Sequence, residues 1–274
     1  MELEGKTAIV TGAGRGIGEG IAMALAREGA HVVLIARRTE GIGEVARRIE
    51  SQGGQALPFS ADVSNKAQIA AMVNATLDRF GTIDILVNNA GIEAPTCQVL
   101  DLPEEQWDRV LSINLKGVFL CSQAVIPTMI AKQSGKIVNI GSLAGRRMSF
   151  FGSADYTASK YGLVGFSHHL AWELAEYKIN VNTICPGGVV TPLMEEGSTP
   201  ELRAMVTKRL VPMGRLGTPQ DIAEAVVFFA GERANWITGQ VLEVDGGTMT
   251  GFGEDLRAFV KKRMADMKAA AAKA

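Results

Sequence analysis

Short apolar runs alternate with amphipathic stretches along almost the whole chain. The runs are nearly continuous in Val, Ile and Leu, which is typical of strands buried on both faces of a sheet. Between them apolar residues recur every three or four positions, as helices require, for example at Ile17, Ile21 and Leu25. The pattern predicts strands at 7–10, 31–36, 56–59, 83–87, 136–140, 179–184 and 241–244. It predicts a helix from the first strand to about Arg27, and others at 43–51, 66–80, 104–131, 154–177 and 220–230.

Seven strands with intervening helices predict an α/β fold, a parallel sheet covered by helices on both faces. No linker, repeat or charge run divides the chain, so residues 1–263 are expected to form a single domain. The segment 189–217 interrupts the alternation and is rich in proline, so it is the expected substrate loop. The Ala-rich segment 264–274 is expected to be a frayed helix or a disordered tail.

Composition narrows the class of protein without naming a function. The 274 residues are 47% hydrophobic and 21% charged, and the net charge is −1, so neither nucleic acid nor an acidic membrane is an expected partner. Three cysteines without CxxC spacing and three scattered histidines predict no disulfide framework and no metal site. With no signal peptide and no apolar run near membrane-spanning length, the chain is expected to be cytoplasmic.

A glycine-rich loop joins the first predicted strand to the first helix. Its sequence from Thr11 to Gly18 has the spacing Gly-x-x-x-Gly-x-Gly. A strand, a glycine loop and a helix in this order point free backbone N–H groups at a phosphate, and glycine allows the pyrophosphate to approach closely. The loop therefore predicts dinucleotide binding, although glycine turns also occur for purely structural reasons.

The carboxyl ends of the other predicted strands carry small, polar or glycine residues. In a parallel sheet of this kind ligands bind at the carboxyl ends of the strands. After the glycine loop, these ends hold Arg37-Arg38, Asp62-Val63, Asn88-Asn89-Ala90-Gly91, Gly141-Ser142 and the segment from Pro186 to Thr191. Six such ends together indicate one extended binding site.

Tyr156 and Lys160 stand four residues apart on a predicted helix, hence on one face of it. A tyrosine with a pKa near 10 is a poor acid or base at neutral pH. A neighbouring ammonium group favours the phenolate, so Lys160 is expected to lower the pKa of Tyr156. Ser142 could hold a substrate carbonyl oxygen by a hydrogen bond. Taken alone, Tyr-x-x-x-Lys is a common accident of any helix face.

Together these motifs resemble the short-chain dehydrogenase/reductase (SDR) family in its classical form. The resemblance covers about Gly5 to Thr248 and rests on the loop from Thr11 to Gly18, Asp62-Val63, Asn88 to Gly91, Asn114, Ser142, Tyr156-x-x-x-Lys160 and Pro186-Gly187. It implies a Rossmann-like, doubly wound single domain, a nicotinamide cofactor, and hydride transfer between a secondary alcohol and a ketone. It also implies a homotetramer.

The resemblance assigns catalytic roles to four residues. Tyr156 would be the general acid in reduction and the base in oxidation. Lys160 would hold the nicotinamide ribose and lower the pKa of Tyr156, and Ser142 would orient the substrate carbonyl. Asn114 would interrupt its helix to hold a water that links Lys160 to solvent, with a buried polar residue at a kink as the alternative.

The end of the second strand indicates the choice of cofactor. NAD-selective relatives place an Asp there for the ribose hydroxyls, whereas this chain has Ala36 followed by Arg37 and Arg38. Guanidinium groups suit a 2′-phosphate, and Arg15 in the glycine loop could add a third. NADP(H) is therefore the expected cofactor and NAD(H) a possible one; Arg38 could equally be a solvated surface charge. The expected cofactor-binding residues are Gly12, Gly14, Arg15, Gly16, Ile17, Gly18, Arg37, Arg38, Asp62, Val63, Asn89, Ala90, Gly91, Tyr156, Lys160, Pro186, Gly187, Val189 and Thr191.

The substrate pocket is expected to be built by segments 93–96, 143–152 and 190–215. Met148, Phe150, Phe151, Leu193 and Met194 favour a bulky apolar substrate, such as a hydroxysteroid or another alicyclic alcohol. The expected substrate residues are Ser142, Met148, Tyr156, Gly187, Leu193 and Met194.

Two other functions stay open from the sequence. The first is a 3-oxoacyl-[acyl-carrier-protein] reductase-like enzyme, against which count the spacing from Ser142 to Tyr156 and the chain beyond Gly247. The second is a nucleotide-binding redox sensor without catalysis, against which counts the intact set of Asn114, Ser142, Tyr156 and Lys160. A Rossmann-like methyltransferase is disfavoured, because it would not need Tyr156 and Lys160.

Overall fold

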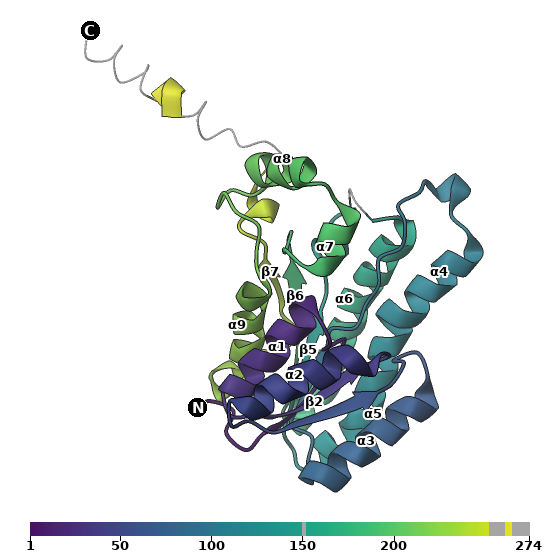
Figure 1. Cartoon of the computed structure of the whole chain (residues 1–274), viewed down its shortest axis with the longest axis vertical. Coiled ribbons are helices and arrows are strands. Elements are labelled where there is room, and N and C mark those ends of the chain that lie inside the picture. Colours follow the sequence, from purple (N-terminus) through teal and green to yellow (C-terminus); the bar gives the residue numbers. More distant parts are fainter. Residues whose placement is uncertain (150–151, 252–260, 265–274) are drawn as a thin grey trace.

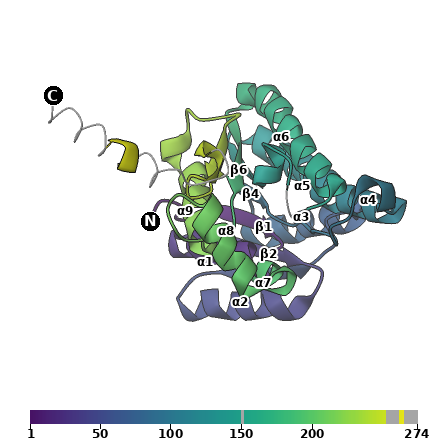
Figure 2. The same cartoon turned by 90° about the horizontal axis from the view of Figure 1, so that it is seen from above.

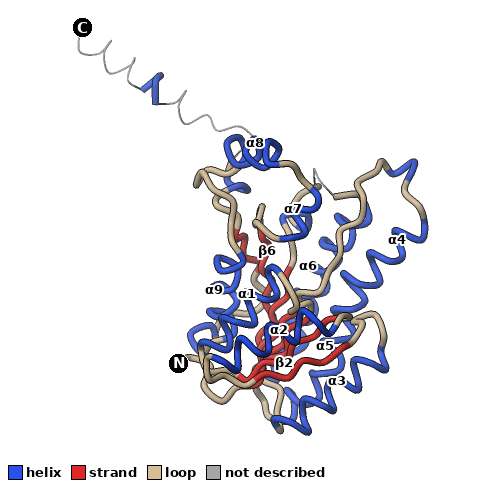
Figure 3. The backbone as a smooth tube through the Cα atoms, viewed as in Figure 1, coloured by secondary structure: helices blue, strands red, loops and turns tan. Residues whose placement is uncertain are grey.

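One parallel sheet of seven strands organises the computed structural model, which describes residues 1–149, 152–251 and 261–264 (Figures 1 and 3). The strand order is β3-β2-β1-β4-β5-β6-β7, so the order reverses between β1 and β4. The expected Rossmann-like, doubly wound α/β fold is confirmed. The strands are β1 (Thr7–Thr11), β2 (His31–Ala36), β3 (Ala56–Ser60), β4 (Ile85–Asn88), β5 (Gly135–Ile140), β6 (Ile179–Pro186) and β7 (Val241–Val244).

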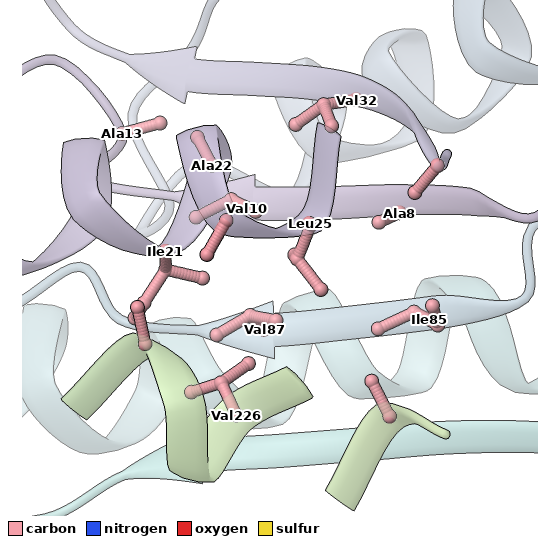
Figure 4. Close-up of a cluster of buried hydrophobic side chains, with 14 of the residues drawn as sticks. Ala8, Val10, Ala13, Ile21, Ala22, Leu25, Val32, Ile85, Val87 and Val226 are labelled. Atoms are coloured by element: carbon pink, nitrogen blue, oxygen red, sulfur yellow. The ribbon is translucent and has the colours of Figure 1, made fainter. Parts of the chain in front are cut away.

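Helices cover both faces of the sheet (Figure 2). Successive residues of the central strands point to opposite cores. In β1, Ala8 and Val10 pack in one core while Ile9 packs in the other. Figure 4 shows the first core, where Val10 lies near Ile21 and Leu25 of α1. That core includes α1 (Gly16–Arg27), α2 (Thr39–Ser51) and α9 (Pro219–Ala230). The second includes α3 (Lys66–Phe80), α5 (Gly117–Ala131) and α6 (Ala154–Leu174).

Some boundaries differ from the sequence pattern. The expected helix at 43–51 begins at Thr39. Its first turn was not predicted because Gly41 and Gly43 are weak helix formers. The expected substrate loop contains α7 (Pro192–Gly197) and α8 (Pro200–Leu210), which lie at the end of the sheet to which β6 runs (Figure 1). Residues 265–274 of the expected tail lie outside the described residues. Short 3-10 turns occupy Val99–Asp101, Leu143–Gly145, Ala175–Tyr177, Glu232–Ala234 and Thr248–Thr250.

The long helical region Glu104–Ala131 corrects the expectation that no apolar segment approaches membrane-spanning length. It comprises α4 (Glu104–Leu111), a π-helical turn at Ser112–Lys116 and α5, and its most apolar window has a mean hydropathy of 1.4. Half of that window is buried inside the fold. Core helices of water-soluble domains have the same length and composition, and α5 packs in this way against β4, β5 and α3.

Three helices at the carboxyl end of the chain begin with the pair Thr-Pro. In each, the threonine hydroxyl accepts a hydrogen bond from a backbone N–H of the first turn, and proline occupies the first helical position. At α9 the carboxylate of Asp221 also accepts from the backbone N–H of Thr218, which completes a capping box. Hydrogen bonds from Arg215 hold the pKa of Asp221 well below its usual range.

The variant Thr218→Ala is expected to lower the free energy of unfolding by about 1 kcal/mol, because the α9 cap loses its hydroxyl acceptor. Chemical denaturation measures this change. Thr218→Ser is the matched control, since it keeps the hydroxyl and should stay close to wild type. An equal loss in both variants would contradict the capping role.

Candidate active site

The glycine loop between β1 and α1 has a backbone that only glycine adopts without strain. Gly12 and Gly16 have φ angles of +68° and +62°, in the left-handed region. A Cβ on Gly18 would lie 2.2 Å from the carbonyl oxygen of Gly12, so the loop and the helix touch there. Gly14 approaches α2 in the same way, because a Cβ on Gly41 would lie 2.7 Å from the Gly14 oxygen. Ile17 packs against the first core and so fixes the direction of α1.

The end of β4 holds this loop in place. The Asn89 amide donates hydrogen bonds to the carbonyl oxygens of Thr11 and Gly12, at 2.9 and 3.2 Å. The Thr11 hydroxyl accepts from the backbone N–H groups of Asn89 and Ala90, both at 3.0 Å. In the described part of the chain no side chain caps the start of α1. Its first N–H groups therefore stay available to an anion.

A cleft opens beside the loop where the order of the strands reverses. Its empty volume is about 390 Å³, and it is lined by Gly12, Ile35, Ala36, Arg37, Ala61, Asp62, Val63, Ala90, Ile92 and Ile113. The structure thus brings together the carboxyl ends of four strands, as expected. A hydrogen bond from Ser64, reinforced by the charge of Arg37, lowers the pKa of Asp62 and keeps it ionised.

These residues fit an adenine dinucleotide. The cleft offers apolar walls and a carboxylate for an adenosine, the start of α1 offers N–H groups for a pyrophosphate, and Arg37 and Arg38 are exposed at the rim. Arg15 is placed differently from the expectation of a free phosphate-binding group. Its guanidinium forms an exposed ion pair with Glu196 of α7 at 2.8 Å.

The expected catalytic residues meet next to this cleft. Tyr156 and Lys160 lie on one face of α6, with the Lys160 Nζ atom 5.7 Å from the centre of the Tyr156 ring. Lys160 is only 5% exposed, and its Nζ donates a hydrogen bond to the Ile140 carbonyl oxygen at 3.0 Å. Ser142, just beyond β5, lies close enough to Tyr156 to lower the pKa of its hydroxyl group. Gly91 connects the two parts of the site, because a Cβ there would lie 3.7 Å from Lys160 Nζ.

The electrostatics correct one expectation. Burial raises the pKa of Tyr156 to about 12, with the Ser142 hydrogen bond opposing the rise and the charge of Glu93 adding to it. Burial likewise lowers the pKa of Lys160 to about 8. The expectation that Lys160 lowers the pKa of Tyr156 is therefore wrong, because burial raises that pKa. Tyr156 is a protonated phenol at neutral pH, and its raised pKa makes it a weaker acid than an exposed tyrosine.

Asn114 lies in the π-helical turn Ser112–Lys116, so the expected interruption of the helix is present. Its side-chain oxygen accepts from the backbone N–H of Ile92 at 2.8 Å. Its amide donates to the Ile92 carbonyl oxygen at 2.9 Å and to the Ser159 hydroxyl at 3.2 Å. The Asn114 side chain thus joins the segment after β4 to α6. The same oxygen lies 3.3 Å from the Cβ position of Gly91, on the side of Lys160.

The chain after β6 closes the other side of the site. Pro186 ends β6, and a Cβ on Gly187 would lie 2.8 Å from the Cα of Asp245. Val189 is buried and forms an isolated parallel bridge with Gly217. Thr191 caps α7 and lies against the glycine loop, with its Cβ 3.5 Å from the Cβ position of Gly16.

Of the expected substrate residues, Ser142, Tyr156 and Gly187 are described above, Met148 lies between β5 and α6, and Leu193 and Met194 lie on α7. Met148 and Leu193 are 59% and 46% exposed, and the Met194 methyl group approaches Gly188. Phe150 and Phe151 lie outside the described residues. Arg146 is engaged by Glu243 at 2.6 Å, so its charge is already paired.

Two acidic residues lie beside Tyr156: Glu93 belongs to the expected substrate segment 93–96, whereas Asp155 was not anticipated from the sequence. Glu93 follows the Asn-Asn-Ala-Gly segment by two residues, and Asp155 is fully buried directly before Tyr156. Asp155 accepts hydrogen bonds from the Tyr156 backbone N–H and from Gln106.

Comparisons with known proteins agree with this geometry. A family model described as enoyl-(acyl carrier protein) reductase matches residues 12–249. The 3-oxoacyl-[acyl-carrier-protein] reductase of Thermotoga maritima is 38% identical over 247 residues, which cover 90% of this chain and 99% of that protein. Among solved structures, levodione reductase superposes with a TM-score of 0.87 at 32% identity, covering 91% of this chain and 100% of that one. A short-chain type dehydrogenase/reductase from Mycobacterium marinum has a TM-score of 0.86 at 33% identity, covering 91% and 98%. The chain therefore belongs to the short-chain dehydrogenase/reductase family of oxidoreductases.

Proposed function

We propose that the protein is an NADP(H)-dependent oxidoreductase that interconverts a ketone and a secondary alcohol. The observation that supports this proposal is that the segment after β4 contacts both the glycine loop and the catalytic side chains. Asn89 holds the glycine loop, while Gly91 lies against Asn114 and Lys160. A nucleotide held by the loop is thereby brought next to Tyr156.

The proposed mechanism divides the work among four side chains. The nicotinamide of the bound cofactor supplies or accepts the hydride. Tyr156, a protonated phenol at neutral pH, donates its proton to the carbonyl oxygen in reduction and takes it back in oxidation. Ser142 orients that oxygen through a hydrogen bond. Buried Lys160 holds the cofactor ribose and returns protons to Tyr156, and Asn114 fixes the path toward solvent.

The proposed cofactor residues form a cradle around the dinucleotide. Gly12, Gly14, Gly16, Ile17 and Gly18 would bind the pyrophosphate, with the adenosine held between Asp62, Val63, Ala90 and the second strand. Arg37 and Arg38 would bind the 2′-phosphate of NADP(H). The nicotinamide end would lie against Pro186, Gly187, Val189 and Thr191.

The double variant Arg37→Ala, Arg38→Ala is expected to weaken NADPH binding about tenfold or more, because two charge-assisted contacts to the phosphate are lost. Binding of NADH should stay nearly unchanged, since NADH lacks that phosphate. Fluorescence titration with both cofactors measures the two affinities. Arg47→Ala, on the exposed side of α2, is the control. Tighter binding of NADH than NADPH by the wild-type protein would overturn the choice of NADP(H).

Two substrate classes are supported by different observations. Relatives named 3-oxoacyl-[acyl-carrier-protein] reductase, at about two-fifths identity over nearly their whole length, favour a 3-oxoacyl thioester, and we place this class first. The apolar side chains of Met148, Leu193 and Met194 on the segments after β5 and β6, and the likeness to levodione reductase, favour an alicyclic ketone or alcohol, including a hydroxysteroid. A non-catalytic redox sensor would not need the intact set of Asn114, Ser142, Tyr156 and Lys160.

The deciding experiment follows the absorbance of NADPH with one representative of each class. Acetoacetyl-coenzyme A represents the thioesters, and a decalone represents the alicyclic ketones. Faster turnover of the thioester supports the first class, and faster turnover of the decalone supports the second. Tight binding of NADPH without turnover of any ketone would support the sensor instead.

We further propose a homotetramer in the cytoplasm. Large apolar side chains are exposed in two groups, Phe119, Tyr161 and Trp172 on α5 and α6, and Phe228, Trp236 and Leu242 around α9 and β7. Two separate apolar surfaces are what a tetramer with two kinds of interface requires. All three cysteines, Cys97, Cys121 and Cys185, are free thiols, as a reducing compartment allows.

A further inference from the structure

Glu93 lies on a segment that is hydrogen-bonded to the residue before α6, the helix that carries Tyr156. The Asn114 side chain is hydrogen-bonded to both the backbone N–H and the carbonyl oxygen of Ile92, the residue before Glu93. A few residues further, the Ser153 hydroxyl accepts from the backbone N–H of Cys97 at 3.0 Å and donates to the Pro95 carbonyl oxygen at 3.2 Å. The backbone that carries Glu93 is therefore anchored before and after it.

The Glu93 carboxylate lies beside the ring of Tyr156. Both side chains approach the same point, the Cβ position of Gly152, which is 3.0 Å from Glu93 Oε1 and 2.9 Å from Tyr156 Cδ1. A side chain at position 152 would displace one of them, so the glycine allows the carboxylate to stand next to the ring. The carboxylate thus stands next to the ring that carries the reacting hydroxyl.

This carboxylate has no hydrogen-bond donor or ion-pair partner among the described residues, although Lys160 is close enough to act on its charge. The residue as a whole is exposed at the surface. Neighbouring protein partly desolvates the carboxyl group, and this, with the nearby charge of Asp155, raises the pKa of Glu93 against the opposing charge of Lys160. A partly desolvated carboxylate without a protein donor gains from a ligand that brings one.

We propose that Glu93 is a specificity-determining residue that accepts a hydrogen bond from a neutral O–H or N–H donor of the substrate. An ionised carboxylate only accepts, so a carbonyl or ether oxygen cannot replace the donor. An anionic group at this position would be repelled by both Glu93 and Asp155. A cationic group would meet the ammonium of Lys160. Of these three kinds of substrate group, a neutral hydrogen-bond donor is the one that the charges around Glu93 do not oppose.

The proposal rests on the proposed ketone reduction and narrows its substrate. The donor can come from a hydroxyl group next to the reacting carbon, as in an alicyclic α-hydroxyketone. It can also come from the amide N–H of the pantetheine arm of an acyl thioester. Either source presents the same chemistry to Glu93, and matched pairs of substrates distinguish them.

The test compares two substrate pairs with NADPH as cofactor. One pair is 2-hydroxycyclohexanone and cyclohexanone. The other is the N-acetylcysteamine thioester of acetoacetic acid, whose amide is a donor, and the S-butyl thioester, which has none. Each is measured with the wild-type protein, Glu93→Leu, Glu93→Gln and the control Glu44→Gln on the exposed side of α2.

Glu93→Leu should lower kcat/KM for the donor-bearing member of one pair at least about tenfold, mainly through KM, and change the other member less than about threefold. Glu93→Gln keeps an amide oxygen as acceptor and should lie between the two. The pair that responds identifies the source of the donor. Equal losses on both members of each pair, or no loss on any, would overturn the proposal.

Binding measurements separate this inference from the proposed reaction. If the wild-type protein reduces no member of either pair, the proposed function fails for these substrates. The affinity of the NADP(+) complex of Tyr156→Phe for the donor-bearing compounds, with and without Glu93→Leu, still decides the role of Glu93. A weaker affinity on loss of the carboxylate supports it, and an unchanged affinity refutes it.

Discussion

The variant Tyr156→Phe should lose about 10²–10⁴-fold in kcat/KM, the range that a positioned general acid contributes. The change removes one hydroxyl and keeps the ring, so the packing of α6 is preserved. The hydroxyl lost is the one whose pKa Ser142 influences. Initial rates of NADPH oxidation with the best ketone substrate measure the effect.

Tyr161→Phe is the matched control for this prediction. Tyr161 is on the same helix but is 47% exposed, away from the cleft. It should keep nearly wild-type activity, and both variants should bind NADPH with unchanged affinity. If Tyr156→Phe retained wild-type turnover, the assignment of Tyr156 as the proton donor would be wrong.

The variant Gly18→Ala is expected to have the second large effect, because its Cβ would lie 2.2 Å from the Gly12 oxygen and 2.5 Å from the Asn89 amide nitrogen. Neither the loop backbone nor Asn89 can move without breaking the hydrogen bonds that shape the phosphate site. We expect a loss of about 1–3 kcal/mol in the free energy of unfolding, as for overpacked sites, together with a loss of NADPH affinity of at least about tenfold.

Gly43→Ala tests whether the effect is specific to the glycine loop. A Cβ on Gly43 would meet no atom within 4 Å, and the residue lies inside α2. This variant should be as stable as wild type or more stable by about 0.5–1 kcal/mol, because alanine favours the helix. Wild-type stability and NADPH binding in Gly18→Ala would contradict the proposed role of the loop.

The sheet could be predicted from the sequence because its strands are buried on both faces. Residues such as Ile9 and Val10 point to opposite cores, so both must be apolar, and the run stands out in the sequence. The carboxyl ends of these strands then locate the site by topology alone. The placement of Asn89 against the glycine loop follows from this rule, although they are far apart in sequence.

Other features depend on contacts that a linear pattern does not contain. The pairing of Arg15 with Glu196 needs α7 to fold over the glycine loop, and α7 is too short for a periodic pattern. Its Thr191-Pro192 start was nevertheless a usable signal, repeated at Thr199-Pro200. The raised pKa of Tyr156 comes from burial, which depends on the complete fold rather than on the spacing to Lys160.

The ion pair between Arg15 and Glu196 also links the cofactor loop to the segment that surrounds the substrate. Arg15 precedes α1, and Glu196 lies on α7, next to Met194. A 2′-phosphate at the rim would compete with Glu196 for the same guanidinium. The exposed pair has little stability of its own to lose, so Arg15 remains able to contribute to cofactor binding.

The most direct test of the central claim is isotope transfer. NADPH carrying deuterium at the hydride position is incubated with the protein and a ketone that it reduces, and the alcohol formed is analysed by mass spectrometry and NMR. Hydride transfer beside Tyr156 predicts deuterium on the carbinol carbon and a solvent proton on the oxygen. Alcohol with solvent hydrogen on the carbinol carbon, or consumption of NADPH without labelled alcohol, would contradict it.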